Sequence, residues 1–464
     1  MDDTNCKGGL YMETVTLFAL ILFAVTYIVM LAFQKIRPHA AVISALIFVI
    51  VGNLGVFPGF SYSPLEALKE IDWNVIMMIV GTMGTVYLFI ESKMPQLMSD
   101  VLVDKTPSVK WAVLSLSLFA GFISAFVDNV ATVLMIAPVA LAMCKKLNIS
   151  PVAPIICIAV SSNLQGAATL VGDTTSILLA KAANLDFLDF FVDEGRMGMF
   201  FVVELGALAS ALVLLFMFRH ENEPVNMHER TKVQDMFPTW LLLATLVCLI
   251  AVSFIPYKNG AKPGQFYKPD ITNGLICVGF FIIGLIRDLL KNKDSATVKG
   301  ALKEIDYYTI ILLMGLFVVI GGISRAGVID LLGQTIAKLN GGGTRGDLFL
   351  VYSVIVWVSV ILSAFIDNIP YTTTMLPVVA VLAADLSSAG GVAISPKLFY
   401  YGLLCGATLG GNLTPIGASA NIAGIGILRR EGYEVKAGTF MKYGVPFTLA
   451  AVITGYVLIW FIWA

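Results

Sequence analysis

Two aspartate–asparagine pairs stand inside long apolar stretches of this sequence. Asp128 and Asn129 lie in "AFVDNVATVLMIAPV" (125–139), and Asp367 and Asn368 lie in "AFIDNIPYTTTMLPV" (364–378). A carboxylate in apolar surroundings is costly unless it is neutralised, hydrated or paired with a cation. The two pairs therefore predict polar sites that take up a cation or a proton, and not groups that face lipid.

Two glycine-rich stretches, "GAATLVGDTTS" (166–176) and "GGNLTPIGASAN" (410–421), interrupt other apolar runs. Glycine lets a helix unwind without a side-chain clash. Unwound backbone at membrane depth is tolerated only where it lines a cavity or is buried in protein. The freed carbonyls, with Asn and Thr oxygens, suit a dehydrated cation, while helix N-termini can face an anion.

The predicted site contains no catalytic residue, and no cofactor is expected beyond Na⁺ or H⁺ as the coupling ion. Na⁺ is expected at Asp128, Asn129, Asp367 and Asn368, and Asp173 is a third carboxyl able to hold a cation or a proton. The candidate ion- or substrate-binding residues are Asp128, Asn129, Thr132, Gly166, Thr169, Gly172, Asp173, Thr174, Asp367, Asn368, Thr372, Thr373, Gly411, Asn412, Thr414, Gly417, Ser419 and Asn421.

The composition identifies the elements that must position these residues. Of 464 residues, 58% are hydrophobic and only 13% are charged, whereas soluble domains carry about 25% charged residues. Apolar segments of roughly 18 to 25 residues recur, each long enough to cross a bilayer. The net charge of −1 and the lack of a basic patch argue against a nucleic-acid partner. The sequence predicts an all-α polytopic membrane protein whose partners are the lipid bilayer and a small ion or small-molecule substrate.

The predicted spans fall into two halves joined by a polar linker at 219–236. The first half, 1–218, has scaffold spans within 14–91, an interrupted region at 109–143, a broken helix at 152–182 and a last span near 196–218. The second half, 237–464, has scaffold spans within 238–324, an interrupted region at 348–384, a broken helix at 397–428 and a last span near 443–463.

Short sequence matches support the division into repeats. "ALKEID" occurs at 67–72 and at 301–306, "FVDN" matches "FIDN", and "TLVGDTTSI" (169–177) matches "TPIGASANI" (414–422). The matches keep their order, and their offset rises only from 234 to 245 residues. Three ordered matches indicate two homologous halves.

The arm after Asp128 and Asn129, residues 130–143, corresponds to about 21 Å of helix, which is short for a span. We therefore expect re-entrant hairpins at 109–143 and 348–384, five crossings in each half, and inverted repeats. With the N-terminus outside, the predicted cytoplasmic segments hold 19 of the 30 Lys and Arg residues, as the positive-inside rule requires. This predicts a multi-pass protein of the cell (inner or plasma) membrane with its N-terminus outside.

"FVDNVATVLMIAPV", "GDTTS" and "LGGNLTPIGASANIAG" resemble the ion transporter superfamily, in its arsenite permease/NhaD antiporter/melanosomal P-protein branch. The resemblance covers nearly the whole chain, and it extends distantly to the sodium-coupled dicarboxylate transporters. It implies a scaffold domain, a transport domain with elevator motion, and a homodimer. It also implies that Asn129 and Asn368 line two pseudo-symmetric sites. Aspartate replaces the serine of the dicarboxylate carriers at each tip, which favours cation chemistry.

These observations lead to a secondary active transporter coupled to Na⁺ or H⁺, with sodium/proton antiport favoured, and not to an enzyme. The alternative within transport is a Na⁺- or H⁺-coupled carrier of an anion such as arsenite, chloride or a di- or tricarboxylate. A minor alternative is an intramembrane aspartyl protease, in which paired aspartates share a proton. Its glycine motif is incomplete here, because Leu170 stands where the first glycine is expected. A passive channel is a further alternative.

Overall fold

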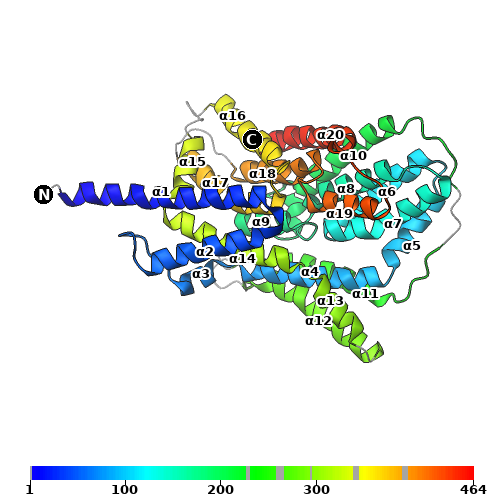
Figure 1. The fold of residues 1–464 in the computed structure, drawn as a ribbon, viewed down its shortest axis with the longest axis horizontal. Coiled ribbons are helices and arrows are strands. Elements are labelled where there is room, and N and C mark those ends of the chain that lie inside the picture. Colours follow the sequence, from blue (N-terminus) through cyan, green and yellow to red (C-terminus); the bar gives the residue numbers. More distant parts are fainter. Residues whose placement is uncertain (1–2, 226–229, 258–265, 293–294, 338–343, 389–394) are drawn as a thin grey trace. The chain divides into compact units, whose positions relative to one another are not determined.

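The computed structural model describes residues 3–225, 230–257, 266–292, 295–337, 344–388 and 395–464. Part of the predicted linker, residues 226–229, lies outside the described residues. The described chain is almost entirely helical, apart from a small hairpin of β1 (Val192–Asp193) and β2 (Arg196–Met197). Figure 1 shows the helices in chain order.

The described residues form ten α-helices in each half, and from the second to the ninth the corresponding helices have similar lengths. Those of the first half are α1 (Asp3–Ala32), α2 (Arg37–Asn53), α3 (Pro64–Glu70), α4 (Trp73–Glu91), α5 (Met94–Asp104), α6 (Val109–Ser124), α7 (Asn129–Leu147), α8 (Val152–Gln165), α9 (Thr174–Ala183) and α10 (Met199–Met217). Those of the second half are α11 (Phe237–Ser253), α12 (Thr272–Asn292), α13 (Ala296–Glu304), α14 (Tyr307–Arg325), α15 (Val328–Ala337), α16 (Arg345–Ser363), α17 (Asn368–Ser388), α18 (Lys397–Gly410), α19 (Ser419–Arg430) and α20 (Ala437–Trp463).

Eight helices among the described residues are long and apolar enough to cross a membrane. They are α4, α7, α10, α12, α14, α16, α20 and the Thr14–Ala32 part of α1. Several shorter apolar helices, including α6, α8 and α11, accompany them. The predicted mostly helical, polytopic membrane fold is confirmed.

The arm that follows Asp128 and Asn129 is longer than the sequence suggested. Helix α7 does not end near residue 143 but continues through Lys145 and Lys146 to Leu147, and its 19 residues in total correspond to about 28 Å. Basic residues in the last turn are favourable there because they lie at the negative end of the helix dipole. The helix is therefore longer than its apolar part, because charge marks the membrane edge and not the end of the helix.

Each predicted broken helix is interrupted where the glycines lie. Helix α8 passes into the short 3₁₀ turn η2 (Gly166–Ala168), and α9 begins only at Thr174. In the second half, α18 passes into η5 (Gly411–Leu413), and α19 begins at Ser419. The residues after the two 3₁₀ turns have nearly the same backbone angles, φ −130° and ψ 169° at Thr169 and φ −127° and ψ 159° at Thr414.

The chain divides into two compact units, and each takes segments from both halves of the sequence. The first unit comprises Met1–Trp73, Asp306–Val354 and Pro370–Tyr400. In it α14 packs on α1 and α2, with Met30, Ala41, Leu312 and Leu316 in a buried cluster.

The second unit comprises Asn74–Ile305, Ile355–Ile369 and Tyr401–Ala464. Within it α6, α7, α8 and α19 pack side by side, and α10 packs along α20 (Figure 1). Both helix breaks and both aspartate–asparagine pairs belong to this unit.

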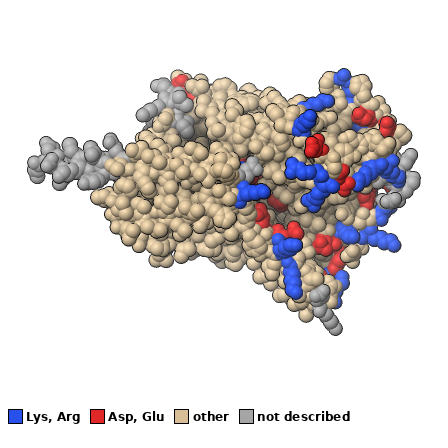
Figure 2. Space-filling view, viewed as in Figure 1, with Lys and Arg blue, Asp and Glu red and all other residues tan. Residues whose placement is uncertain are grey.

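Charged side chains gather over one end of the second unit (Figure 2). The last turns of α7 and α19 contribute basic residues. At the start of α11, Asp235 accepts hydrogen bonds from Arg287 and from Lys291, whose Nζ lies 2.9 Å away. Partial burial opposes ionisation of Asp235, but these hydrogen bonds outweigh it and hold the pKa of the carboxyl well below its usual range.

Candidate functional site

The first aspartate–asparagine pair opens α7. Asp128 is the N-cap residue, and its Oδ1 accepts hydrogen bonds from the backbone N–H of Val130 (3.0 Å) and Ala131 (3.1 Å). An N-cap satisfies donors that the first helical turn leaves unpaired. The Asp128 carboxyl therefore has a structural role at the helix start, beside any role in ion binding.

The second pair opens α17 in a similar way. The Oδ1 of Asp367 accepts from the backbone N–H of Ile369 at 3.3 Å, and its Oδ2 accepts from the Ser419 hydroxyl at 3.3 Å. Asp367 is buried, whereas Asp128 is half-buried. The second contact links the start of α17 to the start of α19.

The broken helices are held to the preceding helix ends by matching contacts. The Thr169 hydroxyl donates to the Ala125 carbonyl, and the Thr414 hydroxyl donates to the Ala364 carbonyl. Farther along, Ser176 Oγ donates to the Gly166 carbonyl at 3.3 Å, and Asn421 Nδ2 donates to the Gly411 carbonyl at 3.1 Å. Buried side chains thus take up carbonyls that the interrupted helices release.

Gly172 and Gly417 lie where backbone carbonyls crowd together. A Cβ on Gly172 would lie 2.6 Å from the Gly166 oxygen and 2.7 Å from the Ser124 oxygen. A Cβ on Gly417 would lie 2.5 Å from the Gly411 oxygen and 2.8 Å from the Ala364 oxygen. Only glycine fits such an approach, so the breaks place several carbonyl oxygens close together in each half.

Residues of the two halves meet at Asp173. The amide Nδ2 of Asn368 donates to Asp173 Oδ2 at 3.1 Å, and the Thr175 hydroxyl donates to the same oxygen at 3.0 Å. Thr175 also shares a hydrogen bond of 3.0 Å with the hydroxyl of Thr408 in the second half. The Asp173 side chain is buried, and these described partners are neutral, so no basic side chain among them balances its charge.

A chain of three asparagines makes a second contact between the halves. Asn129 Nδ2 donates to Asn163 Oδ1 at 3.0 Å, and Asn163 Nδ2 donates to Asn412 Oδ1 at 3.1 Å. Asn163 Nδ2 also reaches the Thr408 carbonyl at 2.9 Å. All three asparagines are buried, and amides in such a place supply neutral oxygen ligands.

Several candidate side-chain oxygens are buried without a hydrogen-bond partner among the described residues. In the described part of the chain, Thr132 Oγ1 and Asn421 Oδ1 are buried without a hydrogen-bond partner in the second unit. Thr372 Oγ1 is in the same situation within the first unit, where Thr373 is also buried. An unused buried acceptor is costly, and a bound cation or water would satisfy it.

The predicted site residues are thus arranged in two groups. Sixteen lie in the second unit, where hydrogen bonds join Asp173 to Asn368, Asn129 through Asn163 to Asn412, and Asp367 to Ser419. Thr372 and Thr373 lie in the first unit. No group of three or more His, Cys, Asp or Glu able to hold a metal occurs among the described residues. The oxygens gathered here are those of single carboxylates, side-chain amides, hydroxyls and backbone carbonyls.

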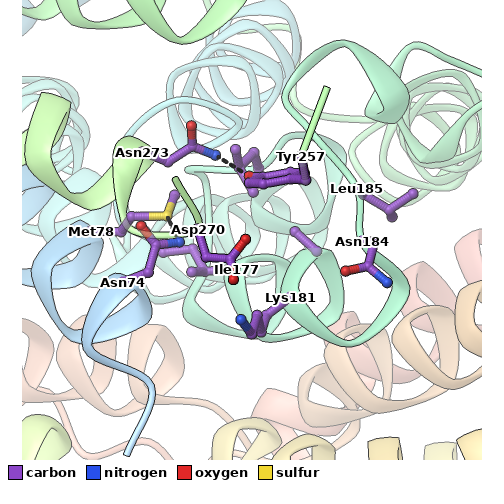
Figure 3. A pocket seen from close by; sticks show the side chains of 11 residues that line it. Asn74, Met78, Ile177, Lys181, Asn184, Leu185, Tyr257, Asp270 and Asn273 are labelled. Carbon is purple, nitrogen blue, oxygen red and sulfur yellow. Dashed lines mark hydrogen bonds between the residues drawn. The ribbon is translucent and has the colours of Figure 1, made fainter. Parts of the chain in front are cut away.

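A small cavity of about 30 Å³ lies beside α9, between that helix and the starts of α4 and α12 (Figure 3). Lys181, Asn74 and Asp270 are among its lining residues, and Asn273 donates to the Tyr257 hydroxyl at 3.2 Å. Near it, the buried Lys268 forms an ion pair of 2.6 Å with Asp186 and lies over the Tyr257 ring. The cavity has room for about one water molecule. It is a minor feature beside the buried polar cluster, which is the set of hydrogen-bonded residues around Asp173 and Asn163 described above.

A match to a protein-family model identifies the family of this chain. The model of the citrate transporter family (CitMHS) matches residues 28–401, which is more than half of the chain. The chain belongs to this family. The resemblance to the ion transporter superfamily that the motifs indicated is thereby confirmed.

Relatives of this CitMHS member are named as transporters or membrane proteins. An uncharacterized transporter of Mycobacterium tuberculosis is 31% identical over 84% of this chain and 86% of its own. The 46 kDa membrane protein of Mycobacterium leprae is 28% identical over 96% and 98%. The human P protein is 25% identical over 84% of this chain but only 53% of its own length. These names favour transport over the protease alternative.

Solved transporter structures share the fold of this CitMHS chain at low sequence identity. The YdaH transporter of Alcanivorax borkumensis aligns over 97% of this chain and 98% of its own, with a TM-score of 0.56 and 16% identity. MtrF of Neisseria gonorrhoeae aligns over 92% and 94%, with a TM-score of 0.55 and 13% identity. These structures show the fold, and the family match with the named relatives identifies the chain as a multi-pass integral membrane transporter.

Sequence reasoning missed several polar residues that this CitMHS fold buries. Asn163, Thr175 and Thr408 make the contacts between the halves, and Gln165 and Glu204 form a further pair described below. Each stands within an apolar helix, which is the same signal that identified Asp128. Asn, Gln and Thr give a weaker sequence signal, because burying a neutral polar side chain costs less free energy than burying a charge.

Proposed function

We propose that this chain is a secondary active transporter coupled to Na⁺ or H⁺, with sodium/proton antiport favoured. The observation that carries the proposal is the buried Asp173 carboxyl, which takes hydrogen bonds from Asn368 and Thr175 and has no basic partner among the described residues. A buried carboxylate of this kind requires a cation or a proton. Competition between Na⁺ and H⁺ for one carboxyl couples their movements.

The surrounding oxygens supply the rest of a cation site. The amides of Asn129 and Asn412, the carbonyls gathered at Gly172 and Gly417, and the carboxyls of Asp128 and Asp367 are all hard oxygen donors. We propose two pseudo-symmetric sites, one per half, within inverted repeats that each contain a re-entrant hairpin and a broken helix. The matching contacts of Thr169 and Thr414 support this symmetry.

Alternating access by an elevator motion, a homodimer, a cell-membrane location and an N-terminus outside belong to the same proposal. They rest on the superfamily resemblance and on the charge bias, which places most Lys and Arg on one side. Accessibility of single cysteines placed at the ends of α1 and α20 to an impermeant reagent would test the orientation.

The test of coupling uses purified protein in proteoliposomes that contain a pH-sensitive dye. An imposed Na⁺ gradient should move protons, and Asp173→Asn should abolish this movement while the protein stays folded. Asp330→Asn changes an exposed carboxyl in α15 and serves as the matched control. Antiport is wrong if an imposed Na⁺ gradient moves no protons through the wild-type protein.

The second candidate is a Na⁺- or H⁺-coupled anion carrier, and two observations favour it. The matching family is described as one of citrate transporters, and the N-termini of α9 and α19 open at the glycine breaks, where helix dipoles attract an anion. Thermal stabilisation by a panel of anions, with and without Na⁺, would separate the candidates, because a ligand of the folded state raises its stability. Stabilisation by citrate only in the presence of Na⁺ or at low pH would favour symport.

A further inference from the structure

Glu204 is a solitary carboxyl inside a candidate membrane span. It lies in α10, whose 19 residues contain no other charged side chain, and its side chain is half-buried. An ionisable group inside a membrane helix is costly, so it is retained for a purpose. None of the contacts that build the buried polar cluster involves it.

Within the described part of the chain, Glu204 has a hydrogen-bond partner in Gln165, the last residue of α8. Gln165 Nε2 donates to Glu204 Oε2 at 3.4 Å. The Gln165 side chain is buried and fills the space beside Gly121, where a Cβ would lie 2.1 Å from Gln165 Oε1. Gly121 therefore fixes the position of this amide against α6.

The second side-chain oxygens of Glu204 and Gln165 lack a hydrogen-bond donor among the described residues. Glu204 Oε1 and Gln165 Oε1 are both buried and have no hydrogen-bond partner within the described part of the chain. Both are acceptors when Glu204 is ionised. A single proton on Glu204 Oε1 would turn one acceptor into a donor, and the acid and the amide would then make two hydrogen bonds to each other.

From this geometry we propose that Glu204 is a proton-binding site outside the buried polar cluster, with Gln165 as the positioning residue whose Oε1 accepts a hydrogen bond from the protonated carboxyl. When the site empties, the O–H bond of the carboxyl breaks and the proton passes to water. The carboxylate keeps the electron pair, and no other bond changes. The amide then loses one of its two hydrogen bonds.

The titratable and charged groups on the elements packed against α10 make their contacts with residues other than Glu204. On α20, Tyr443 stacks on Phe218 and Lys442 lies over the Tyr443 ring, while Tyr456 packs against Trp357. On β2, Arg196 donates to the Ile462 carbonyl. On α6, Lys110 donates to Asn222. Cys157 lies eight residues before Gln165 on α8. Among the described residues, none of these groups forms a hydrogen bond or ion pair with Glu204.

The position of Gln165 connects this proton to transport, a step that rests on the proposed function. Gln165 directly precedes Gly166, whose carbonyl accepts from Ser176, and the break that follows leads to Asp173. A change in the hydrogen bonding of Gln165 therefore acts at the start of η2. Glu204 would set how freely the broken helix moves, while Asp173 binds the ion.

The test measures the proton itself and then its effect. Infrared difference spectra of the purified full-length protein, recorded on stepping the pH from acid to alkaline, should contain a protonated-carboxyl band that Glu204→Gln removes. Gln at this position makes an amide–amide pair with the same two hydrogen bonds, so the fold is retained. Glu434→Gln, at an exposed loop carboxyl, is the matched control and should leave the band intact.

In proteoliposomes, Glu204→Gln should flatten the pH dependence of transport while flux at acid pH persists. Glu204→Asp should keep a pH dependence with a displaced midpoint, which provides a second variant if the first is poorly folded. An unchanged band and an unchanged pH profile in Glu204→Gln would overturn the proposal. If Asp173→Asn alone abolishes flux in that case, the proposed function stands without the Glu204 site. If Glu204→Gln removes the band but no Na⁺ or H⁺ coupling exists, the proton site stands and the proposed function fails.

Discussion

Gly172→Ala is the sharpest test of the broken helix. The added methyl would lie 2.6 Å from the Gly166 oxygen, 2.7 Å from the Ser124 oxygen and 2.8 Å from the Ala125 oxygen. All three atoms belong to the backbone, so no flexible side chain can move away. Overpacking of a close-packed interior costs about 1–3 kcal/mol, and the three simultaneous contacts place this variant at about 2–3 kcal/mol.

The matched control is Gly426→Ala in α19. A Cβ there has no heavy atom within 4 Å, and alanine is favoured over glycine inside a helix by roughly 0.5–1 kcal/mol. The two variants make the same chemical change in broken helices of the same unit. They should nevertheless change stability in opposite directions.

The assay is thermal unfolding of the purified protein in detergent, followed by flux in proteoliposomes. Gly172→Ala should lower the unfolding temperature and the flux, and Gly426→Ala should leave flux intact and unfolding unchanged or later. Gly417→Ala should behave like Gly172→Ala, because its Cβ would lie 2.5 Å from the Gly411 oxygen. Equal stability of Gly172→Ala and Gly426→Ala would refute the close approach of carbonyls that the cation site requires.

Three further perturbations have defined outcomes. Asp173→Asn should still accept the hydrogen bonds from Asn368 and Thr175 but removes the charge. Na⁺ should then no longer raise the unfolding temperature, and retained stabilisation by Na⁺ would exclude Asp173 as a ligand. Lys268→Met leaves the buried Asp186 without its ion-pair partner and should cost about 3–5 kcal/mol, with partial recovery in the double variant with Asp186→Asn. Asp235 has a folded-state pKa below its unfolded value. Its contribution to the free energy of unfolding is therefore present at neutral pH and is lost as the pH falls below the ordinary carboxyl pKa of about 3.9. The stability difference between wild type and Asp235→Asn should shrink between pH 7 and pH 3.

The sequence predicted the helices best where hydrophobicity has sharp limits. The scaffold spans predicted within 14–91 end with α4 at Glu91, and those predicted within 238–324 end one residue before α14 does. It did least well where a helix continues past the apolar residues, as α7 does through Lys145 to Leu147. Hydropathy measures the solvent that a residue prefers, whereas a helix ends where capping and backbone hydrogen bonding end it.

The short amphipathic helices were missed for a related reason. Helices α5 and α15 contain 11 and 10 residues, too few to be detected by a search for membrane spans. For the site, the acidic residues were found because a charge is costly inside a membrane, and the glycines were found because they let a helix unwind. Contacts such as Asn163 to Asn412 depend on which helices pack together, and periodicity within one segment carries no information about that.

The two halves differ at one position in a way that separates structure from function. Asp173 and Ala418 precede α9 and α19 with nearly the same backbone angles, φ −143° and ψ 152° against φ −142° and ψ 145°. Neither side chain caps its helix, so the turn forms without a carboxyl. Asp128, by contrast, caps α7 through two hydrogen bonds. Since the fold does not need a carboxyl at position 173, and burying one is costly, the charge of Asp173 is better explained by ion binding than that of Asp128.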